Sequence, residues 1–369
     1  MRSPLLAGLA IACIVAIALV PDWEGELHAQ GYEEFSSIAA EALRDAELER
    51  RDVTNRLEES RGETTARKWG TFLSLQRNTI RRRRSGLENG FDSETPGILA
   101  GLDRRLSDAL LLGMAAGFKV TDLEFDDVPR SENFYDKKDP RNPRQLGRQR
   151  TYTGTAGPYL SYTPGQAWYL NASLLAGLLA ASTERSGDGL NGTARGDTRG
   201  YRLSLAGGGG YDWRYHALRV GPHLNVAWDH VHIDGFSESG QDTKRLLRLR
   251  HIEDDLVTIK SGGRASYALG FSWGALVPNW RLDFVYRDLD RSGMGKVFLL
   301  HPDPSICNTP RCDRFKFLLE RPDRTSMEVG LGLQFVLPHH LTFWLDYEEN
   351  FLERFFARTR LTVGVRKQF

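Results

Sequence analysis

Long apolar runs are scarce in this sequence of 369 residues. The exception is Leu5–Val20, and later runs are broken every few residues by Gly, Ser, Arg or Asp. A membrane-spanning helix needs about 20 apolar residues, so no later segment is predicted to cross a membrane as a helix. An excess of charge of one sign is also missing. The formal net charge of +1 argues against a nucleic-acid partner.

Cysteine is equally scarce, with three residues. Cys13 lies in the N-terminal apolar run. Cys307 and Cys312 form a Cys-x4-Cys pair between predicted strands, where we expect a disulfide if the chain is exported. Two thiols with only His301 nearby do not supply the ligands of a zinc site. We therefore expect no metal and no other cofactor.

Residues 1–29 have the three parts of a secretory signal peptide. Arg2 gives the positive start, the apolar run gives the core, and Leu27-His28-Ala29 is a plausible cleavage site. The apolar run of about 16 residues is short for a spanning helix, which favours a cleaved signal over an uncleaved anchor. The sequence therefore predicts an exported chain.

From residue 69 onward, apolar and polar residues alternate with a period of two, which is typical of β-strands. Twelve strands can be drawn. Alternation alone would also fit a soluble sandwich with one wet face. However, the strands reach the 9–11 residues that cross a bilayer, and their polar faces mix small and charged residues. Aromatic residues near strand ends, Tyr159 and Trp344 among them, suggest interfacial girdles.

The connections between these strands alternate in length. Short ones fall near 105–108, 163–166, 212–216, 270–273 and 338–340, and long ones near 78–94, 121–150, 181–197, 231–257, 288–321 and 351–356. Outer-membrane barrels have an even number of strands, short periplasmic turns and longer external loops. Residues 69–369 are therefore predicted to form an all-β, closed antiparallel barrel in a Gram-negative outer membrane. If one of the first two strands, near 69–77 and 95–104, does not form, the requirement for an even number of strands reduces the predicted count to ten.

The segment 30–68 is charged and predicted to be helical. It has no Pro, and a thin apolar stripe runs through Ile38, Ala42, Val53 and Leu57 at helical spacing. Charged residues on nearly every helical turn are compatible with two locations for this helix. The helix could lie in the lumen as a plug, or stand in the periplasm as a spacer.

Several segments resemble the autotransporter β-domain family. Ser204-Leu-Ala-Gly-Gly-Gly-Gly-Tyr-Asp-Trp is similar to the family's central hairpin, and Ser261-Gly-Gly-Arg-Ala-Ser-Tyr-Ala to the next one. The C-terminal strand resembles the family's assembly signal through Leu361, Val363, Val365 and Phe369.

The resemblance implies a twelve-stranded barrel with a helix entering its lumen. It also implies presentation or secretion of an N-terminal passenger. About forty residues separate the predicted signal from the barrel, so we expect a member without a large passenger and without enzymatic activity.

Inward-facing charges are the main candidates for a functional role. They are Arg202, Arg219, Asp229, Arg264, Arg281, Asp283, Glu328, Asp346, Arg358 and Arg360. These charges could set ion selectivity, hold a plug helix or pair with one another. A pore or channel is therefore the alternative function. An outer-membrane hydrolase is a further alternative, because Asp229, His230, His232 and Asp234 lie close together at a strand end.

The expected partners follow from the predicted location. They are outer-membrane lipid, lipopolysaccharide, the barrel-assembly machinery and periplasmic chaperones. Two basic stretches, Arg81–Arg84 and Lys137–Arg150, fall in predicted outer loops, where guanidinium groups could bind lipopolysaccharide phosphates.

Overall fold

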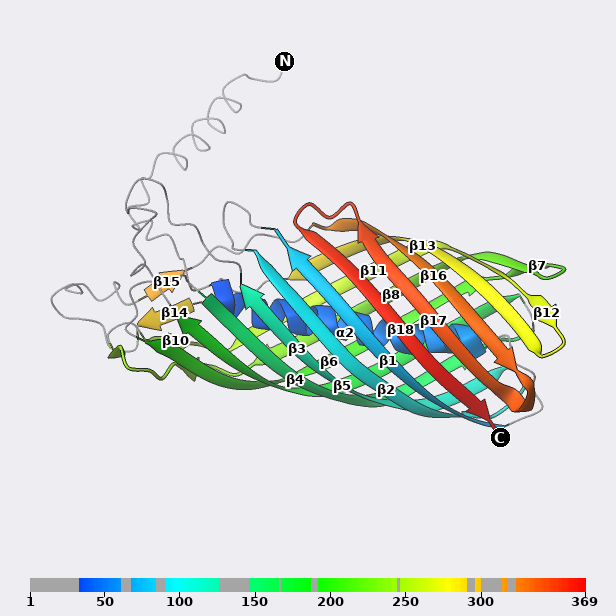
Figure 1. Cartoon of the computed structure of the whole chain (residues 1–369), viewed down its shortest axis with the longest axis horizontal. Coiled ribbons are helices and arrows are strands. Elements are labelled where there is room, and N and C mark those ends of the chain that lie inside the picture. The colour runs from blue at the N-terminus through cyan, green and yellow to red at the C-terminus, as the bar shows by residue number, and fades with distance from the viewer. Residues whose placement is uncertain are drawn as a thin grey trace, which may run out of the picture. The chain divides into compact units, whose positions relative to one another are not determined.

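The computed structural model describes residues 33–60, 68–83, 90–125, 146–165, 167–186, 192–243, 246–290, 296–299, 314–316 and 323–369. Within these ranges an α-helix, α2 (Glu33–Ser60), is surrounded by a barrel of antiparallel strands (Figure 1). No helix in the described ranges has the length and apolar character that crossing a membrane requires.

Twelve long strands form the barrel wall. They are β1 (Trp69–Arg82), β2 (Phe91–Arg105), β3 (Leu110–Phe125), β4 (Leu146–Tyr162), β5 (Trp168–Ser186), β6 (Thr193–Tyr211), β8 (Leu218–Ile233), β11 (Ile252–Tyr267), β13 (Gly274–Asp290), β16 (Thr325–Leu337), β17 (Leu341–Phe351) and β18 (Phe356–Gln368). Each pairs antiparallel with the next long strand along the chain.

The first and last strands close the barrel. β1 and β18 pair from Gly70↔Gln368 to Arg82↔Phe356, and the backbones of Trp69 and Phe369 are hydrogen-bonded as well. Lipid cannot satisfy the hydrogen bonds of an open strand edge, so closure is the arrangement that a bilayer permits. The prediction of a closed twelve-stranded barrel is confirmed, including both uncertain strands.

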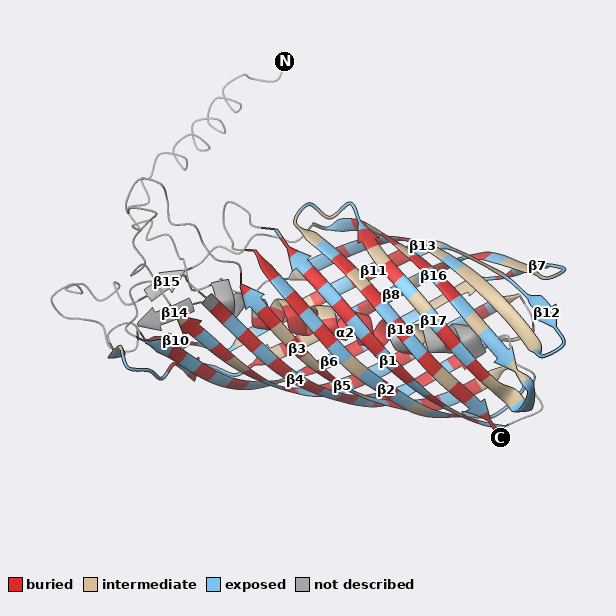
Figure 2. Cartoon of the chain, viewed as in Figure 1, coloured by how far each residue is buried: buried red, intermediate tan, exposed pale blue. Residues whose placement is uncertain are grey.

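Side chains alternate between the outer and inner faces of the wall. Figure 2 shows this as a chequered pattern of buried and exposed residues along each strand. The outer face carries large apolar side chains such as Leu178, Phe284 and Leu331. The inner face carries buried polar and charged residues, many of them from the predicted lumen set.

The strands extend further than predicted on the side of the long connections. β1 reaches Arg82, β4 begins at Leu146 and β6 begins at Thr193, all inside segments predicted as loops. Outward-facing charges in these additional strand residues form cross-strand ion pairs, such as Glu94 with Arg77 and Glu184 with Arg195. The side with the long connections is called the loop end below, and the opposite side the turn end.

Short strands complete both ends. At the turn end, β7 (Trp213–Tyr215) and β12 (Leu269–Phe271) extend two neighbouring hairpins, and the 3-10 helix η2 (Pro338–His340) joins β16 to β17. At the loop end, β9 (Phe236–Ser237), β10 (Leu247–Leu249), β14 (Lys296–Leu299) and β15 (Arg314–Lys316) form a separate sheet. These four strands lie within two segments predicted as long loops.

Candidate functional site: the charged lumen and its helix

The helix α2 lies inside the barrel and packs against β3, β4, β5, β6, β8 and β11 (Figure 1). Most of its described side chains are buried, the apolar Ile38 and Leu48 as well as the charged Glu41 and Glu49. The sequence left two locations open for this helix, the lumen and the periplasm. The structure places it in the lumen.

Charge complementarity fits α2 to the wall. The helix contains nine acidic and four basic residues. A buried carboxylate is costly unless cations and hydrogen-bond donors surround it. The inner face of the barrel supplies these cations from strands that lie far apart in the sequence.

The largest cluster is built around two buried carboxylates, Glu47 on α2 and Glu328 on β16. Lys260 Nζ lies 2.8 Å from Glu47 and 3.2 Å from Glu328, and Arg287 Nη2 lies 3.1 Å from each. Arg51 and Arg358 also form ion pairs with Glu328. Four cations therefore hold one helical and one wall carboxylate in the middle of the lumen.

A second group of contacts fastens the neighbouring turn of α2 to another part of the wall. Glu49 pairs with Arg202 on β6. Asp45 accepts a hydrogen bond of 2.9 Å from the Thr121 hydroxyl, and Lys119 donates one of 3.1 Å to the Asp45 carbonyl oxygen. Helix and wall are thus joined through β3 and β6 as well.

The adjacent arginines Arg50 and Arg51 reach different strands. Arg50 pairs with Asp229 on β8 at 3.1 Å. Arg51 contacts Glu328 and lies 2.9 Å from Glu348 on β17. Successive residues on a helix point in different directions, so this pair braces α2 against two parts of the wall.

The C-terminal part of α2 has an apolar contact instead. Val53 and Leu57 pack in a buried cluster with Phe72, Leu99, Leu111, Ala115, Tyr159, Leu175 and Trp344. Tyr159 also donates a hydrogen bond of 3.1 Å to Asp103. The prediction that Tyr159 and Trp344 belong to interfacial girdles is wrong, because both rings point inward and pack beneath the helix.

The structure places the ten predicted lumen charges on the inner face. Arg202, Asp229, Asp283, Glu328, Arg358 and Arg360 are buried. Arg264 pairs with Asp212, and Arg281 pairs with Glu348. Arg219 and Asp346 line an open cavity at the turn end.

Several residues of the central cluster were not predicted. Glu47 and Arg51 belong to a helix whose location was open. Lys119, Lys260 and Arg287 were not among the predicted lumen charges, although each lies two positions from another inward-facing residue of its own strand. The signal that could have found them is the period of two itself, because all three lie within the predicted strands at inward positions.

The residues predicted to form a C-terminal assembly signal lie on the outer face. Leu361, Val363 and Phe369 are exposed there, and Val365 is half-buried. Lys367 is outward too, with its ammonium 5.7 Å from the centre of the Phe369 ring. The predicted disulfide residues, Cys307 and Cys312, lie outside the described residues.

The residues behind the hydrolase alternative are divided between two faces of β8. Asp229 is completely buried in the lumen beside Arg50. His230 and His232 lie on the outer face, where His232 contacts Glu253 and Asp234. The four residues therefore do not converge. Across the described part of the chain, no group of three or more His, Cys, Asp or Glu is arranged to hold a metal ion.

The basic stretches predicted for outer loops lie partly in strands. Arg81 on β1 pairs with Asp92 at 2.8 Å, and Arg82 points into the barrel. Arg150 on β4 pairs with Asp122 at 2.5 Å. Their guanidinium groups are therefore engaged in the wall itself.

The barrel, with its internal helix and charged lumen, can be compared with known proteins. The model of the autotransporter β-domain matches residues 71–348. The chain belongs to the autotransporter β-domain family. Autotransporter β-domains are barrels of the Gram-negative outer membrane, and this member shares their architecture. No curated protein matches the sequence.

Three solved autotransporter structures resemble this family member. The translocator domain of NalP from Neisseria meningitidis is 13% identical, with a TM-score of 0.65 over 90% of this chain and 98% of that one. The β-domain of the Bordetella autotransporter Brka is 17% identical, with a TM-score of 0.57 over 82% and 100%. The transport unit of AIDA-I from Escherichia coli is 15% identical, with a TM-score of 0.58 over 83% and 93%. At these identities the likeness concerns the fold.

Proposed function

We propose that this autotransporter β-domain displays the N-terminal end of α2, with the few residues before it, at the cell surface, and that α2 then closes the barrel. The direction of the helix in the lumen supports this proposal. Arg44, near its start, stacks on Phe356 at the loop end, with 3.7 Å from Cζ to the ring centre. Leu57, near its end, packs with Phe72 and Trp344 towards the turn end. In outer-membrane barrels the loops face outward and the turns face the periplasm.

The closing function of α2 rests on its ion pairs. A helix held by Glu47, Glu49, Arg50 and Arg51 at several strands cannot leave without exposing paired buried charges. Separating one such pair costs about 3–5 kcal/mol. We therefore expect the full chain to conduct ions poorly, in contrast to the alternative of an open pore.

Conductance in planar bilayers tests this closure. The full chain should stay closed, whereas a variant lacking residues 33–60 should open a steady pore. That pore should prefer anions, because Lys119, Arg202, Lys260 and Arg287 would lose the helical groups that they face. Glu47→Gln with Glu49→Gln, which keeps the helix length, should open intermittently. Steady conductance of the full chain at the level of the deletion variant would instead support a pore.

Surface labelling of intact cells tests the direction of transport. An epitope inserted between Gln30 and Gly31 should be accessible to antibody, since it precedes the helix end at the loop side. The same epitope inserted in the η2 turn at Pro338–His340 should be inaccessible until the outer membrane is opened. An inaccessible N-terminal epitope in a folded barrel would refute the transport proposal.

The predicted partners and the leader remain proposals. We propose that the outward residues Leu361, Val363 and Phe369 are read by the barrel-assembly machinery. Lys367 would extend its ammonium to the periplasmic headgroups. The residues 1–29 would be removed as a signal peptide, which N-terminal sequencing of the mature protein would detect. Periplasmic chaperones and lipopolysaccharide are the remaining expected partners.

A further inference from the structure

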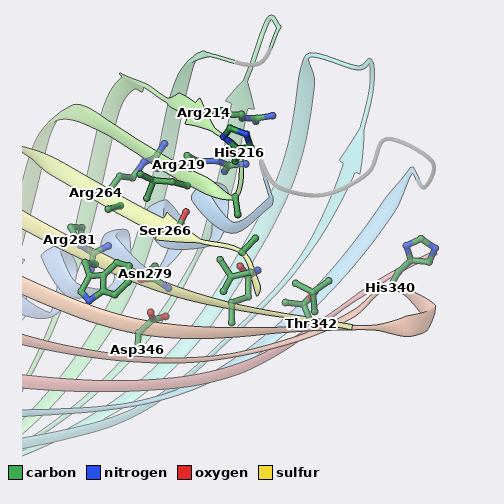
Figure 3. A pocket seen from close by; sticks show the side chains of 18 of the residues that line it. Arg214, His216, Arg219, Arg264, Ser266, Asn279, Arg281, His340, Thr342 and Asp346 are labelled. Carbon is green, nitrogen blue, oxygen red and sulfur yellow. The ribbon is translucent and has the colours of Figure 1, made fainter. Parts of the chain in front are cut away.

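Cavities open at both ends of the barrel. The cavity at the turn end has a volume of about 470 Å³ (Figure 3). Arginines in its lining are engaged within the chain, Arg264 with Asp212 and Arg281 with Glu348. A second cavity, of about 540 Å³, lies on the outer face near the loop end. It is called the groove below, and its volume is in the range of ligand pockets.

Two small side chains on β5 form the floor of the groove. The strand register sets Ala180 between Tyr152 on β4 and Arg199 on β6. In the next outward row it sets Ser182 opposite Asp197 on β6. A small side chain between two large ones leaves a hollow. The groove therefore runs along β5, with walls on β4 and β6.

Residues directly after β8 complete the lining. The Asp234 backbone donates a hydrogen bond of 2.8 Å to the Arg199 carbonyl oxygen, which fixes Asp234 beside the β6 wall. The Asp234 carboxylate lies 3.2 Å from His232 Nε2, and the His232 ring stacks on Tyr201. Asp234 therefore has a partner of its own.

Arg199 and Asp197 carry the remaining charges of the groove. Both are exposed, and within the described part of the chain neither side chain forms an ion pair. The next outward charge on β6 differs, because Arg195 pairs with Glu184 at 2.9 Å. Residues two positions apart on a strand share a face and lie about 7 Å apart. The groove thus presents one cation and one anion side by side.

The groove lies at the edge of the apolar outer face. Leu178, two positions from the groove floor towards the turn end, is largely exposed, as contact with lipid requires. Tyr152 and Tyr201 point outward at this level, and aromatic rings favour the headgroup region of a bilayer. Beside Leu178 the register sets Gly154, where the outer surface is open. This position favours a ligand whose headgroup enters the groove and whose acyl chains follow the outer face.

We propose that the groove binds the zwitterionic headgroup of a membrane lipid, a phosphoethanolamine group, with its phosphate on Arg199 and its ammonium on Asp197. Guanidinium groups bind phosphates in a bidentate geometry, and an ammonium donates charge-assisted hydrogen bonds to a carboxylate. The adjacent hydrocarbon lowers the local dielectric constant, which strengthens both contacts. This inference goes beyond the proposed function, because it assigns a lipid site to the outside of the barrel.

Native mass spectrometry of the folded full chain tests the proposal. The protein is equilibrated in detergent with equal amounts of phosphatidylethanolamine, phosphatidylglycerol and phosphatidylcholine that carry the same acyl chains, and the retained lipids are counted. Phosphatidylethanolamine should be retained preferentially. Phosphatidylglycerol has no ammonium, and the ammonium of phosphatidylcholine has no N–H to donate to Asp197.

Single substitutions separate the two contacts. Asp197→Asn should remove the preference for phosphatidylethanolamine and leave the retention of phosphatidylglycerol unchanged. Arg199→Gln should reduce the retention of phosphatidylethanolamine about fivefold, the upper range for an exposed ion pair. The matched control, Glu184→Gln with Arg195→Gln, removes the neighbouring outward pair on the same two strands and should leave the preference unchanged.

Three results would overturn the proposal. One is equal retention of the three lipids by the unaltered chain, a comparison that does not depend on any variant folding. Another is an undiminished preference for phosphatidylethanolamine in Asp197→Asn, which would leave a site for phosphate alone. The third is an equal loss in the groove variants and the control, which would indicate general surface charge. None of these results would alter the conductance and labelling outcomes on which the proposed function depends.

Discussion

Glu328 is the residue on which the central ion cluster depends. Its carboxylate is buried and contacts Arg51, Lys260, Arg287 and Arg358. Glu328→Gln keeps the shape but removes the anion that these cations share. We expect a loss of about 3–5 kcal/mol in stability, as for breaking a buried pair. The temperature at which the barrel loses its compact migration in detergent gels measures the loss.

The control for this change is Glu94→Gln, which breaks the exposed pair with Arg77 on the outer face. Exposed pairs contribute about 0–1 kcal/mol, so the unfolding temperature should hardly move. An equal decrease in both variants would mean that the central cluster adds no special stability.

Gly113 lies where an aromatic ring needs room on the inner face of β3. A Cβ atom at this position would run into the ring of Tyr159. Gly113→Leu should push Tyr159 away from Asp103 and from the Leu57 cluster, at a cost of about 1–3 kcal/mol from overpacking. Gly154→Ala is the matched control, because a Cβ there meets nothing within 4 Å. Comparable thermal shifts in both variants would contradict this account of Gly113.

At the scale of elements, the period of two was sufficient to predict all twelve strands. The strand ends were predicted less well, because outward charges at the loop end look like loop residues in the sequence. Arg81 and Asp92, for example, pair across β1 and β2 beyond the predicted ends. The interior of the site depends on pairs such as Lys260 with Glu47, whose partners are separated by more than 200 residues. No local pattern in the sequence indicates such contacts.

A buried ion pair ties the small sheet at the loop end to the barrel. Arg185 on β5 donates two hydrogen bonds, of 3.1 and 2.7 Å, to Glu238. The same carboxylate accepts a hydrogen bond of 2.8 Å from the Leu247 backbone. Glu238→Gln should therefore release the 236–249 segment, with several-fold faster cleavage there by protease added to intact cells.

A neighbouring pair provides the control for this element. Glu184 precedes Arg185 on β5, and its exposed carboxylate pairs with Arg195. Glu184→Gln removes only this exposed pair. Cleavage of the 236–249 segment should stay at the level of the unaltered chain. Unchanged protection in Glu238→Gln would show that backbone pairing between Arg195 and Ser239 suffices to hold the sheet.

At the scale of the whole molecule, outward ion pairs near the loop end indicate where the hydrocarbon ends. Leu178 on β5 is 73% exposed on the outer face, and Glu184 follows six positions later. With a rise of about 3.4 Å per residue and a tilt of about 40°, the two lie roughly 15 Å apart along the barrel axis. A spin label at Leu178→Cys, with native cysteines replaced, should be accessible to oxygen. A label at Glu184→Cys should be accessible to a water-soluble nickel complex, and equal profiles would contradict this placement.

The pairing of β1 with β18 also has a consequence for the order of folding. The strands that meet at this seam lie at opposite ends of the barrel sequence, so the seam cannot form before Phe369 has been delivered. Closing a loop of about 300 residues costs roughly 5 kcal/mol of chain entropy, and contacts this distant in sequence form slowly. Until then the curved sheet has two unsatisfied edges that can pair with other chains. A nascent barrel of this kind is therefore most prone to aggregate just before it is complete, and a chain that lacks its last strand stays in that state.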